Sequence, residues 1–485
     1  MEKQKSLKLN FIMNVILTVA TIVFPLIIYP YISRILLPEG VGKVALAISI
    51  VSYFSMFAQL GIPVYGLRLV AQLRDDKIAL TKAVQELFII NIVTTVISYI
   101  AFILTLILVP QLIEEKLLYI VVSSSIVLNM IGMEWLFKGL EEYTYITIRS
   151  IIFKITAIIL VFLLIRSKTD YVVYAAITII SGYLSFILNF IYSFKWIHFK
   201  PLQNYNFKQH LKPIFIFFAM ACAITIYTNL DIVMLGFMKT NVDVGYYSVA
   251  VKIKNVLIGL ITSLGAVLLP RSSYYIKHKL FDEFKKVSTK AMSFIFVFSI
   301  PLMIYFILFA KYIVLFLFGS AFSGSIIPMQ IIMPTLLFIG ITNLIGFQIM
   351  VPLGKESLIL YSVFAGGVID MILNFILIPK YSAAGAALGT VVAELIVLIF
   401  QIVIMKKYVL INIKNQEYIK IIFAIFLSVV VSFYSVKFAY NNLFAIITSS
   451  LSFFTVYIMF LYLTKEKITV EIVNLTILKI KKVLK

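Results

Sequence analysis

Cysteine and histidine are scarce in this chain of 485 residues, which has one cysteine, Cys222, and three histidines. A single cysteine excludes a disulfide within the chain. His198, His210 and His278 have no cysteine partners and no HExxH spacing, which argues against a metal site. A GxxxxGK[ST] loop is also absent, and no loop is long enough for an ATPase domain. Transport driven directly by ATP within this chain is therefore excluded.

Charged residues are scarce as well, at 13% of the chain, whereas 62% of residues are hydrophobic and the mean hydropathy is +1.06. A soluble core does not need so much apolar mass. Continuous apolar runs of the length that a bilayer-spanning helix needs follow one another along the chain, without the alternation of barrel strands. The sequence therefore predicts an all-α polytopic membrane protein.

Fourteen transmembrane helices are predicted. Within 291–325 the run KYIVLFLFGSAFSG either extends the ninth span or dips back into the membrane. The predicted spans are 10–33, 44–66, 87–109, 117–137, 150–166, 171–194, 213–237, 245–269, 291–310, 326–350, 357–379, 383–405, 418–436 and 443–464.

The distribution of lysine and arginine sets the predicted orientation. With the N-terminus inside, cytoplasmic segments carry 30 of the 42 basic residues, the opposite loops nine and the spans three. Both termini are therefore expected in the cytoplasm, with the protein in the cell (inner) membrane. The net charge of +21 then reflects topology and attraction to anionic lipids, and no nucleic-acid partner is expected.

The basic tail, residues 465–485, has apolar residues at helical spacing between its lysines. It is expected to lie along the inner membrane surface, with a solvated, frayed tail as the alternative. The apolar positions are Ile468, Ile472, Leu475 and Leu478.

The chain contains an internal repeat. A shift of 203 residues aligns VGKVALAISI at 41–50 with VGYYSVAVKI at 244–253, which places Gly42 on Gly245. The repeat predicts two pseudo-symmetric six-helix lobes in parallel orientation, the usual build of a secondary transporter. The predicted domains are an N-lobe at 1–200, a C-lobe at 201–412, two further helices at 413–464 and the tail at 465–485.

Polar residues form stripes on three spans and are expected to face a cavity, because facing lipid is costly. Lys254 lies on another face of its span and is expected to extend toward the outer membrane surface. The stripes comprise Lys252, Asn255, Gly259, Thr262 and Ser263 in span eight, Asn10, Asn14, Thr18 and Thr21 in span one, and Ser52, Ser55 and Gln59 in span two.

Four further basic residues are candidates for binding an anionic cargo: Arg34, Arg68, Lys154 and Arg271. Each has an alternative interpretation as an anchor at the membrane interface.

Acidic residues gather in other spans. Asp231 lies in span seven, Asp370 and Asn374 in span eleven, and Glu394 in span twelve, where Gly385 and Gly389 permit close helix approach. Such a cluster suits a coupling cation, either a metal ion held by oxygens or a proton on a buried carboxylate. Alternatively, Asp231 forms a salt bridge with Lys252, and Glu394 forms a hydrogen bond between helices.

Three segments resemble the Wzx-type polysaccharide flippases, in the fold group of lipid II flippases and multidrug MATE exporters. They are FPLIIYPYISRILLPEGVGKVALA, TNLDIVMLGF followed by DVGYYSVAVKI, and LNFILIPKYSAAGAALGTVVAE. The resemblance implies a V-shaped two-lobe fold with a cationic central cavity, and no enzymatic activity.

The cargo implied by the resemblance is an undecaprenyl-diphosphate-linked oligosaccharide, a capsule, O-antigen or teichoic-acid precursor, moved from the inner to the outer leaflet. Other membrane proteins of glycan assembly are the implied partners. A cation site is implied at Asp231, Asp370 and Asn374, with Thr390 or Glu394 as the contributor from span twelve. Lys252 within reach of Asp231 would be a departure that disfavours bound Na+ and leaves proton coupling open. No other cofactor is expected.

Two alternatives stay open. A MATE-like drug or cation antiporter would share the lobes but would need an acidic cavity, whereas the stripe on span eight is basic. A membrane enzyme of glycan assembly usually needs a folded external region, and no long extracellular loop is predicted.

Overall fold

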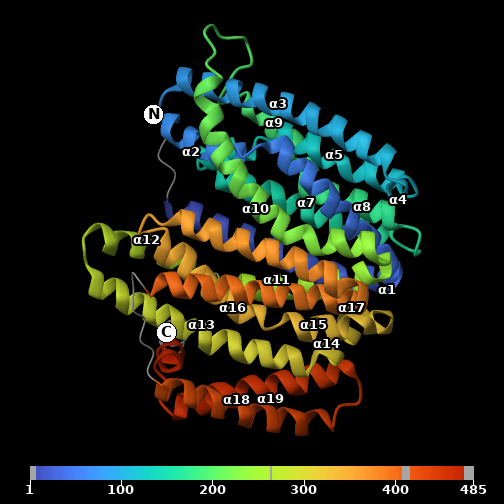
Figure 1. Ribbon diagram of the computed structural model, residues 1–485, viewed down its shortest axis with the longest axis vertical. Helices are drawn as coiled ribbons and strands as arrows, with labels where there is room; N and C mark the ends of the chain where they lie inside the picture. Colours follow the sequence, from blue (N-terminus) through green and yellow to red (C-terminus); the bar gives the residue numbers. More distant parts are fainter. Residues whose placement is uncertain (1–6, 263–264, 407–414, 475–485) are drawn as a thin grey trace, which may run out of the picture. The chain divides into compact units, whose positions relative to one another are not determined.

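Helices make up all of the regular secondary structure that the computed structural model describes, in residues 7–262, 265–406 and 415–474 (Figure 1). Ten helices are long and apolar enough to cross a membrane, or eleven if the bent pair Ser320–Ile332 and Thr335–Met350 forms one span. A helix satisfies its own backbone hydrogen bonds, which lipid cannot do. The predicted all-α, multi-pass membrane fold is confirmed, and the count of fourteen spans stays a prediction.

The chain divides into two compact units, residues 1–245 and 246–485. The first unit extends past residue 200, where the lobe boundary was predicted, and includes α10. Within it, α1 packs against α3, α5, α7 and α10. Its helices are α1 (Leu7–Gln59), α2 (Ile62–Leu73), α3 (Lys77–Leu108), α4 (Pro110–Ile113), α5 (Lys116–Gly132), α6 (Glu134–Gly139), α7 (Tyr143–Leu164), α8 (Tyr171–Ile179), η1 (Ile180–Leu184), α9 (Ser185–Ser193) and α10 (Lys208–Met238).

Helix α1 is broken at Leu37, whose φ of 59° and ψ of 175° are not helical. A proline, Pro38, follows directly, and proline restricts the residue before it to non-helical conformations. The break lies in the predicted connection between spans one and two.

Two glycines that the repeat aligns contact each other's segments in the first unit. A Cβ at Gly42 would collide with the carbonyl oxygen of Asn241, and a Cβ at Gly245 would collide with that of Pro38. Pro38 and Asn241 are separated by the same 203 residues as the two glycines. A contact in which each partner repeats the other's role is typical of a twofold axis. This reciprocity supports the internal repeat over these two short segments.

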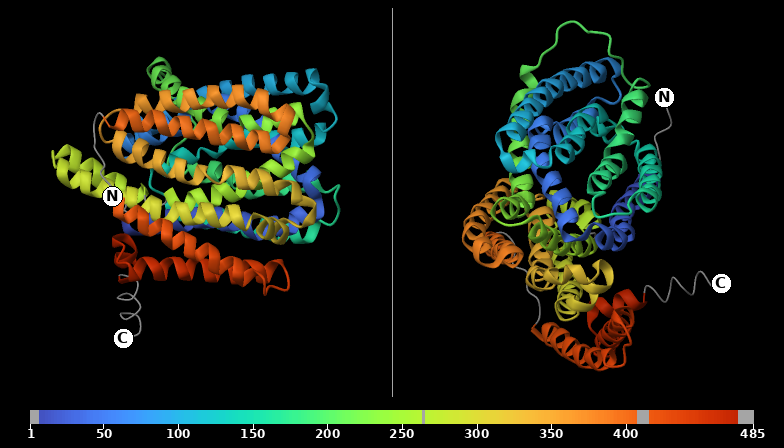
Figure 2. Two further views of the ribbon diagram at one scale, coloured as in Figure 1. Left: turned by 60° about the horizontal axis from the view of Figure 1, so that its bottom comes forward. Right: turned by 90° about the vertical axis from the view of Figure 1, so that its right-hand side faces the viewer.

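The second unit begins within α11 and continues to the tail. The run whose placement was left open at 291–325 forms the separate helix α14 and then the 3-10 helix η2, after α13 has ended at Leu308. The last two long helices, α18 and α19, lie side by side (Figures 1 and 2). The helices are α11 (Asn241–Thr262), α12 (Gly265–Lys277), α13 (Phe281–Leu308), α14 (Ala310–Phe318), η2 (Ser320–Ser325), α15 (Ile326–Ile332), α16 (Thr335–Asn343), η3 (Leu344–Met350), α17 (Glu356–Met405), α18 (Asn415–Val436) and α19 (Asn442–Leu463).

Helix α17 turns back at Ser382, where φ is 49° and ψ is −128°. Its two halves then pack tightly. A Cβ at Gly385 would collide with the carbonyl oxygen of Leu377, and one at Gly389 would lie 2.5 Å from Asn374 Oδ1. The expected close approach at Gly385 and Gly389 is confirmed.

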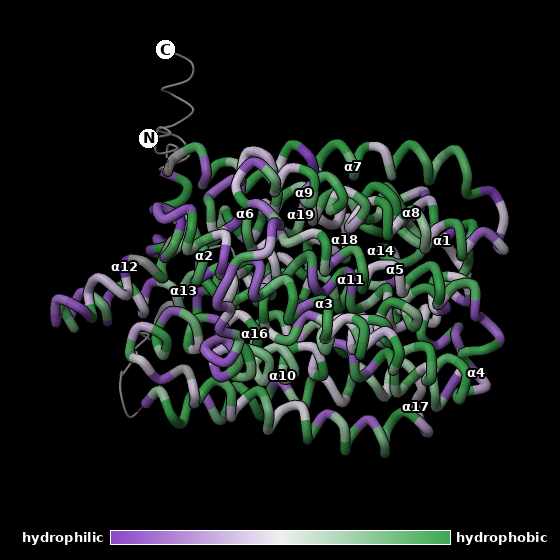
Figure 3. The backbone as a smooth tube through the Cα atoms, turned by 90° about the horizontal axis from the view of Figure 1, so that it is seen from above, coloured by the Kyte–Doolittle hydropathy of each residue, from purple (hydrophilic) through white to green (hydrophobic). Residues whose placement is uncertain are grey.

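The helices differ from one another in hydropathy. In Figure 3, α7 is hydrophobic over most of its length, whereas α12 carries many hydrophilic residues.

The start of the tail packs on the second unit. Residues 467–474 are helical, and the Glu466 carboxylate accepts hydrogen bonds from the backbone N–H groups of Ile468 and Thr469, at 3.0 and 2.7 Å. Ile468 is buried in a cluster with Val297 and Tyr457, so it packs on protein, whereas it was expected to face the membrane. Leu475 and Leu478 lie outside the described residues.

Candidate substrate and cation sites

Helix α11 carries the predicted basic stripe. Lys252 is half-buried, Asn255 is exposed, and the Thr262 hydroxyl donates to the Ile258 carbonyl at 2.9 Å. Ser263 lies outside the described residues. The part of the stripe that is described therefore combines one lysine with an exposed amide, both able to donate hydrogen bonds to an anion.

Lys254, which was expected to extend toward the outer membrane surface, has a buried side chain, at 9% exposure. The reason is that its face of α11 packs on protein, since Leu257 and Ile261 on the same face are buried as well.

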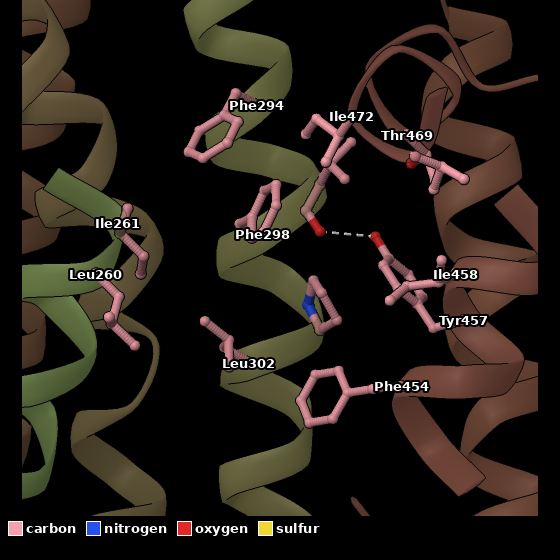
Figure 4. A pocket seen from close by; sticks show the side chains of 13 residues that line it. Leu260, Ile261, Phe294, Phe298, Leu302, Phe454, Tyr457, Ile458, Thr469 and Ile472 are labelled. Carbon is pink, nitrogen blue, oxygen red and sulfur yellow. Dashed lines mark hydrogen bonds between the residues drawn. The ribbon is translucent and has the colours of Figure 1, made fainter. Parts of the chain in front are cut away.

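An apolar groove of about 460 Å³ lies in the second unit (Figure 4). The hydroxyl of Tyr457, one of few polar groups there, already donates to the Val297 carbonyl at 2.8 Å. The groove therefore suits a hydrocarbon chain. Its walls come from α11 (Leu260, Ile261), α13 (Phe294, Phe298, Leu302), α19 (Phe454, Ile458) and the start of the tail (Thr469, Ile472).

The same helix thus contributes to both features. Lys252 precedes Leu260 by eight residues, which corresponds to about 12 Å along α11. A charged donor and the wall of an apolar groove follow each other along one helix.

A buried polar cluster lies where the two halves of α17 meet. Asp370 and Asn374 on the first half are 1% and 0% exposed, and both direct an oxygen toward Gly389 on the second half. Thr390 follows Gly389, and its hydroxyl lies 2.9 Å from the hydroxyl of Tyr247 on α11. The structure therefore brings Asp370, Asn374 and Thr390 together.

Glu394, one turn beyond Thr390, is also buried. The cluster is rich in oxygen ligands of the type that hard cations prefer. Among the described residues, no three His, Cys, Asp or Glu side chains form a group that could hold a metal ion. Any cation held here would therefore need the amide and hydroxyl oxygens of Asn374 and Thr390 as well.

Asp231 lies on α10 in the first unit, where it is 5% exposed. The predicted cation residues thus come from both units, with Asp231 in the first and the other four in the second.

The remaining candidates for binding an anionic cargo have diverse settings. Gln59 donates to the Ser55 hydroxyl at 3.2 Å, and Asn129 donates to the same hydroxyl at 3.3 Å, so these three form one polar group in the first unit. The Lys154 ammonium lies 5.5 Å from the centre of the Phe24 ring. Exposed side chains are found at Asn14, Arg34, Arg68 and Arg271.

One buried hydrogen-bond network, around His210 and Glu86, was not predicted from the sequence. His210 Nε2 lies 2.7 Å from Glu86 Oε2, and the other ring nitrogen lies 2.8 Å from the Tyr65 hydroxyl. Glu86 also accepts from the Asn206 backbone N–H at 2.6 Å and from Gln209 at 3.1 Å. The network ties α2, α3 and α10 to the segment before α10. The only sequence signal was the pair Gln85-Glu86 at the edge of an apolar run.

A family model described as polysaccharide biosynthesis protein matches residues 7–276, more than half of the chain. The chain belongs to this family. A curated relative from Escherichia coli (strain K12), named as an O-antigen transporter, is 26% identical over 399 residues, covering 81% of the chain and 95% of the relative.

Solved structures share the fold of this polysaccharide biosynthesis family member. The lipid II flippase MurJ in an inward closed conformation matches with a TM-score of 0.63 at 18% identity, covering 94% of this chain and 98% of MurJ. An inward-facing MATE family multidrug transporter of the MOP superfamily matches with a TM-score of 0.60 at 12% identity, covering 82% of this chain and 98% of that one. The resemblance to polysaccharide biosynthesis proteins is confirmed, and the chain has the fold of these two solved transporters.

Proposed function

We propose that this protein is a flippase that moves a lipid-linked oligosaccharide, carried on undecaprenyl diphosphate, from the inner to the outer leaflet. The observation that carries the proposal is α11, which presents Lys252 and Asn255 and then forms one wall of the apolar groove. An isoprenoid diphosphate has the same two parts, an anionic head and a hydrocarbon tail. The name of the relative from Escherichia coli and the fold shared with MurJ support the same function.

The physical task of such a protein is to carry a diphosphate past hydrocarbon. A lysine in a low-dielectric setting attracts phosphate more strongly than one in bulk water, so Lys252 lowers this barrier. A single lysine holds the head as a point charge with rotatable donors, which permits release on the other side. The tail stays in lipid and in the groove lined by Phe298 and Leu302.

Coupling to a proton or Na+ is proposed at the cluster on α17. Buried carboxylates such as Asp370 and Glu394 are costly when ionised and therefore favour either a bound cation or a proton. Asp231 on α10 is the candidate from the first unit. Movement of the ion would then be coupled to movement of the cargo through alternating access.

A drug or cation antiporter is the second candidate, because Asp370 and Glu394 also suit a cationic substrate and MATE transporters share the fold. Growth in toxic cations with and without the gene separates the two functions. Protection by the gene favours the antiporter, and loss of surface glycan without protection favours the flippase.

The direct test uses purified protein in liposomes that contain a fluorescent polyprenyl-diphosphate glycan, with a membrane-impermeant reagent to report the glycan's transfer between leaflets. Lys252→Ala is expected to reduce transfer at least about tenfold, equivalent to the loss of one charge-assisted hydrogen bond. Lys252→Arg keeps the charge and should retain most of the transfer. Lys277→Ala removes an exposed charge from α12 and serves as the control. Wild-type transfer by Lys252→Ala would refute the proposed role of α11.

A further inference from the structure

The start of the basic tail lies at one end of the apolar groove. Thr469 and Ile472 of its short helix line the groove together with α11, α13 and α19. In Figure 4 these two residues lie near the level of Phe294 of α13, whereas Leu302 of α13 lies toward the opposite end. In the predicted topology α13 begins on the cytoplasmic side, so Phe294 is nearer the inner leaflet than Leu302. The start of the basic tail therefore lies at the inner-leaflet end of the groove.

The short helix at the start of the basic tail has two different sides. Ile472 is 36% exposed and lines the groove, as does Val473 beside it. Lys467 and Glu471 are exposed and line a separate pocket at the surface. Each apolar wall adds dispersion contacts to a hydrocarbon chain in the groove. The apolar side of this helix thus extends the groove, and its charged side lies outside it.

Contacts with α13 and α19 hold the helix in this position. Ile468 is buried in a cluster with Val297 of α13 and Tyr457 of α19. Glu471 accepts a hydrogen bond from the Lys290 ammonium of α13 at 2.6 Å, and both side chains are about half exposed. An ion pair between exposed side chains contributes little stability. The helix is therefore fixed mainly at Ile468, whereas its contact at Glu471 can open at little cost.

The position of the helix fits the path of the proposed cargo. A polyprenyl chain that starts in the inner leaflet reaches the groove at the end where Ile472 and Val473 lie. We infer that residues 466–474 form a strap that holds the polyprenyl chain of the cargo in the groove. Ile472 and Val473 contact the chain, and Lys290 and Glu471 position the strap. The inference rests on the proposed function and gives the basic tail a part in cargo binding.

The test uses full-length protein in liposomes with a polyprenyl phosphate that has a photoreactive group in its chain and no glycan. Label is expected on α13, on α19 and at Ile472 or Val473, and an excess of unlabelled polyprenyl phosphate should remove it. Competed label on α13 and α19 with none on the strap would overturn the inference and leave the proposed function intact. Label that does not respond to the competitor would indicate contact with ordinary lipid and would overturn both.

A charge in the groove wall tests the contact with the chain. Ile472→Glu should reduce the competed label about tenfold or more. Because Ile472 is partly exposed, this variant is expected to fold. Asn474→Glu places the same charge two residues further along, at an exposed site that does not line the groove, and is the matched control. Equal labelling of the two variants would overturn the inference.

The positioning role of the ion pair has its own test. Glu471→Lys places two like charges together and should reduce the label on the strap about threefold. Adding Lys290→Glu restores opposite charges and should restore the label, which a general loss of stability would not do. A double variant that labels no better than Glu471→Lys alone would overturn the role assigned to Lys290 and Glu471.

Discussion

Helices α1 and α17 are both long and both broken by one residue with positive φ, Leu37 at 59° and Ser382 at 49°. The setting of the break differs. The halves of α17 pack on each other through Gly385 and Gly389, whereas Gly42 of α1 packs on the junction between α10 and α11. After the break in α17 the two halves of that helix pack on each other. After the break in α1 the second half packs on the junction between α10 and α11.

Some of the polar residues of α1 differ in exposure from those of α17, although Ser33 and Ser49 of α1 are buried too. Asn14, Thr18 and Arg34 on α1 are exposed, whereas Asp370 and Asn374 on α17 are buried. Burying such groups costs free energy unless they find partners, so α17 holds a preformed cluster. On α1 the exposed Thr18 hydroxyl instead donates to the Asn14 carbonyl of its own helix, at 2.9 Å.

The largest effect is expected at the buried carboxylate of Glu86, which lies in the first unit on α3 and not on α1. Glu86→Ala removes the acceptor of His210, Asn206 and Gln209 and should destabilise the protein by about 3–5 kcal/mol. Thr18→Val, on the exposed face of α1, should change stability by less than about 0.5 kcal/mol. Thermal unfolding in detergent measures both. An unchanged melting temperature for Glu86→Ala would show that the network contributes no stability.

The next effect concerns the reciprocal contact of α1. Gly42→Ala and Gly245→Ala each place a Cβ against a backbone carbonyl and should cost about 1–3 kcal/mol. Because both changes disturb one contact, the double variant should lose less than the sum of the two. Strictly additive losses in a double-mutant cycle would argue against the shared twofold contact.

Close packing within α17 is tested by Gly385→Ala, whose Cβ meets the Leu377 carbonyl. A loss of about 1–3 kcal/mol is expected. The matched control is Gly182→Ala, because a Cβ at Gly182 has nothing within 4 Å. This control should be neutral or stabilising by about 0.5–1 kcal/mol, since glycine weakens a helix. Equal melting temperatures for the two variants would contradict the tight hairpin.

The smallest effect tests the cluster itself. Tyr247→Phe removes the hydroxyl that meets Thr390 and should cost about 0.5–1.5 kcal/mol. Tyr361→Phe, on an exposed part of α17, should leave the melting temperature as in wild type. If both variants unfold at the same temperature, the hydrogen bond to Thr390 does not stabilise the cluster.

The sequence predicted those features that lipid imposes or that small residues mark. Apolar runs had to become helices, the breaks at Leu37 and Ser382 fall in gaps between predicted spans, and Gly385 and Gly389 marked the close approach. It could not predict that Glu86 meets His210, because the two are 124 residues apart in sequence. The burial of Lys254 was not predicted, because an apolar helix face looks the same in sequence whether it meets lipid or protein.

The most direct test of the proposed function maps where the cargo binds. A polyprenyl-diphosphate glycan with a photoreactive group in its tail is cross-linked to the protein, and the labelled peptides are sequenced by mass spectrometry. The label is expected on the groove of α13 and α19, at Phe298, Leu302 or Phe454, and should decrease in Lys252→Ala but not in Lys277→Ala. Labelling that is confined to other helices, or that does not respond to Lys252, would contradict the assignment of α11 and the groove to the lipid-linked cargo.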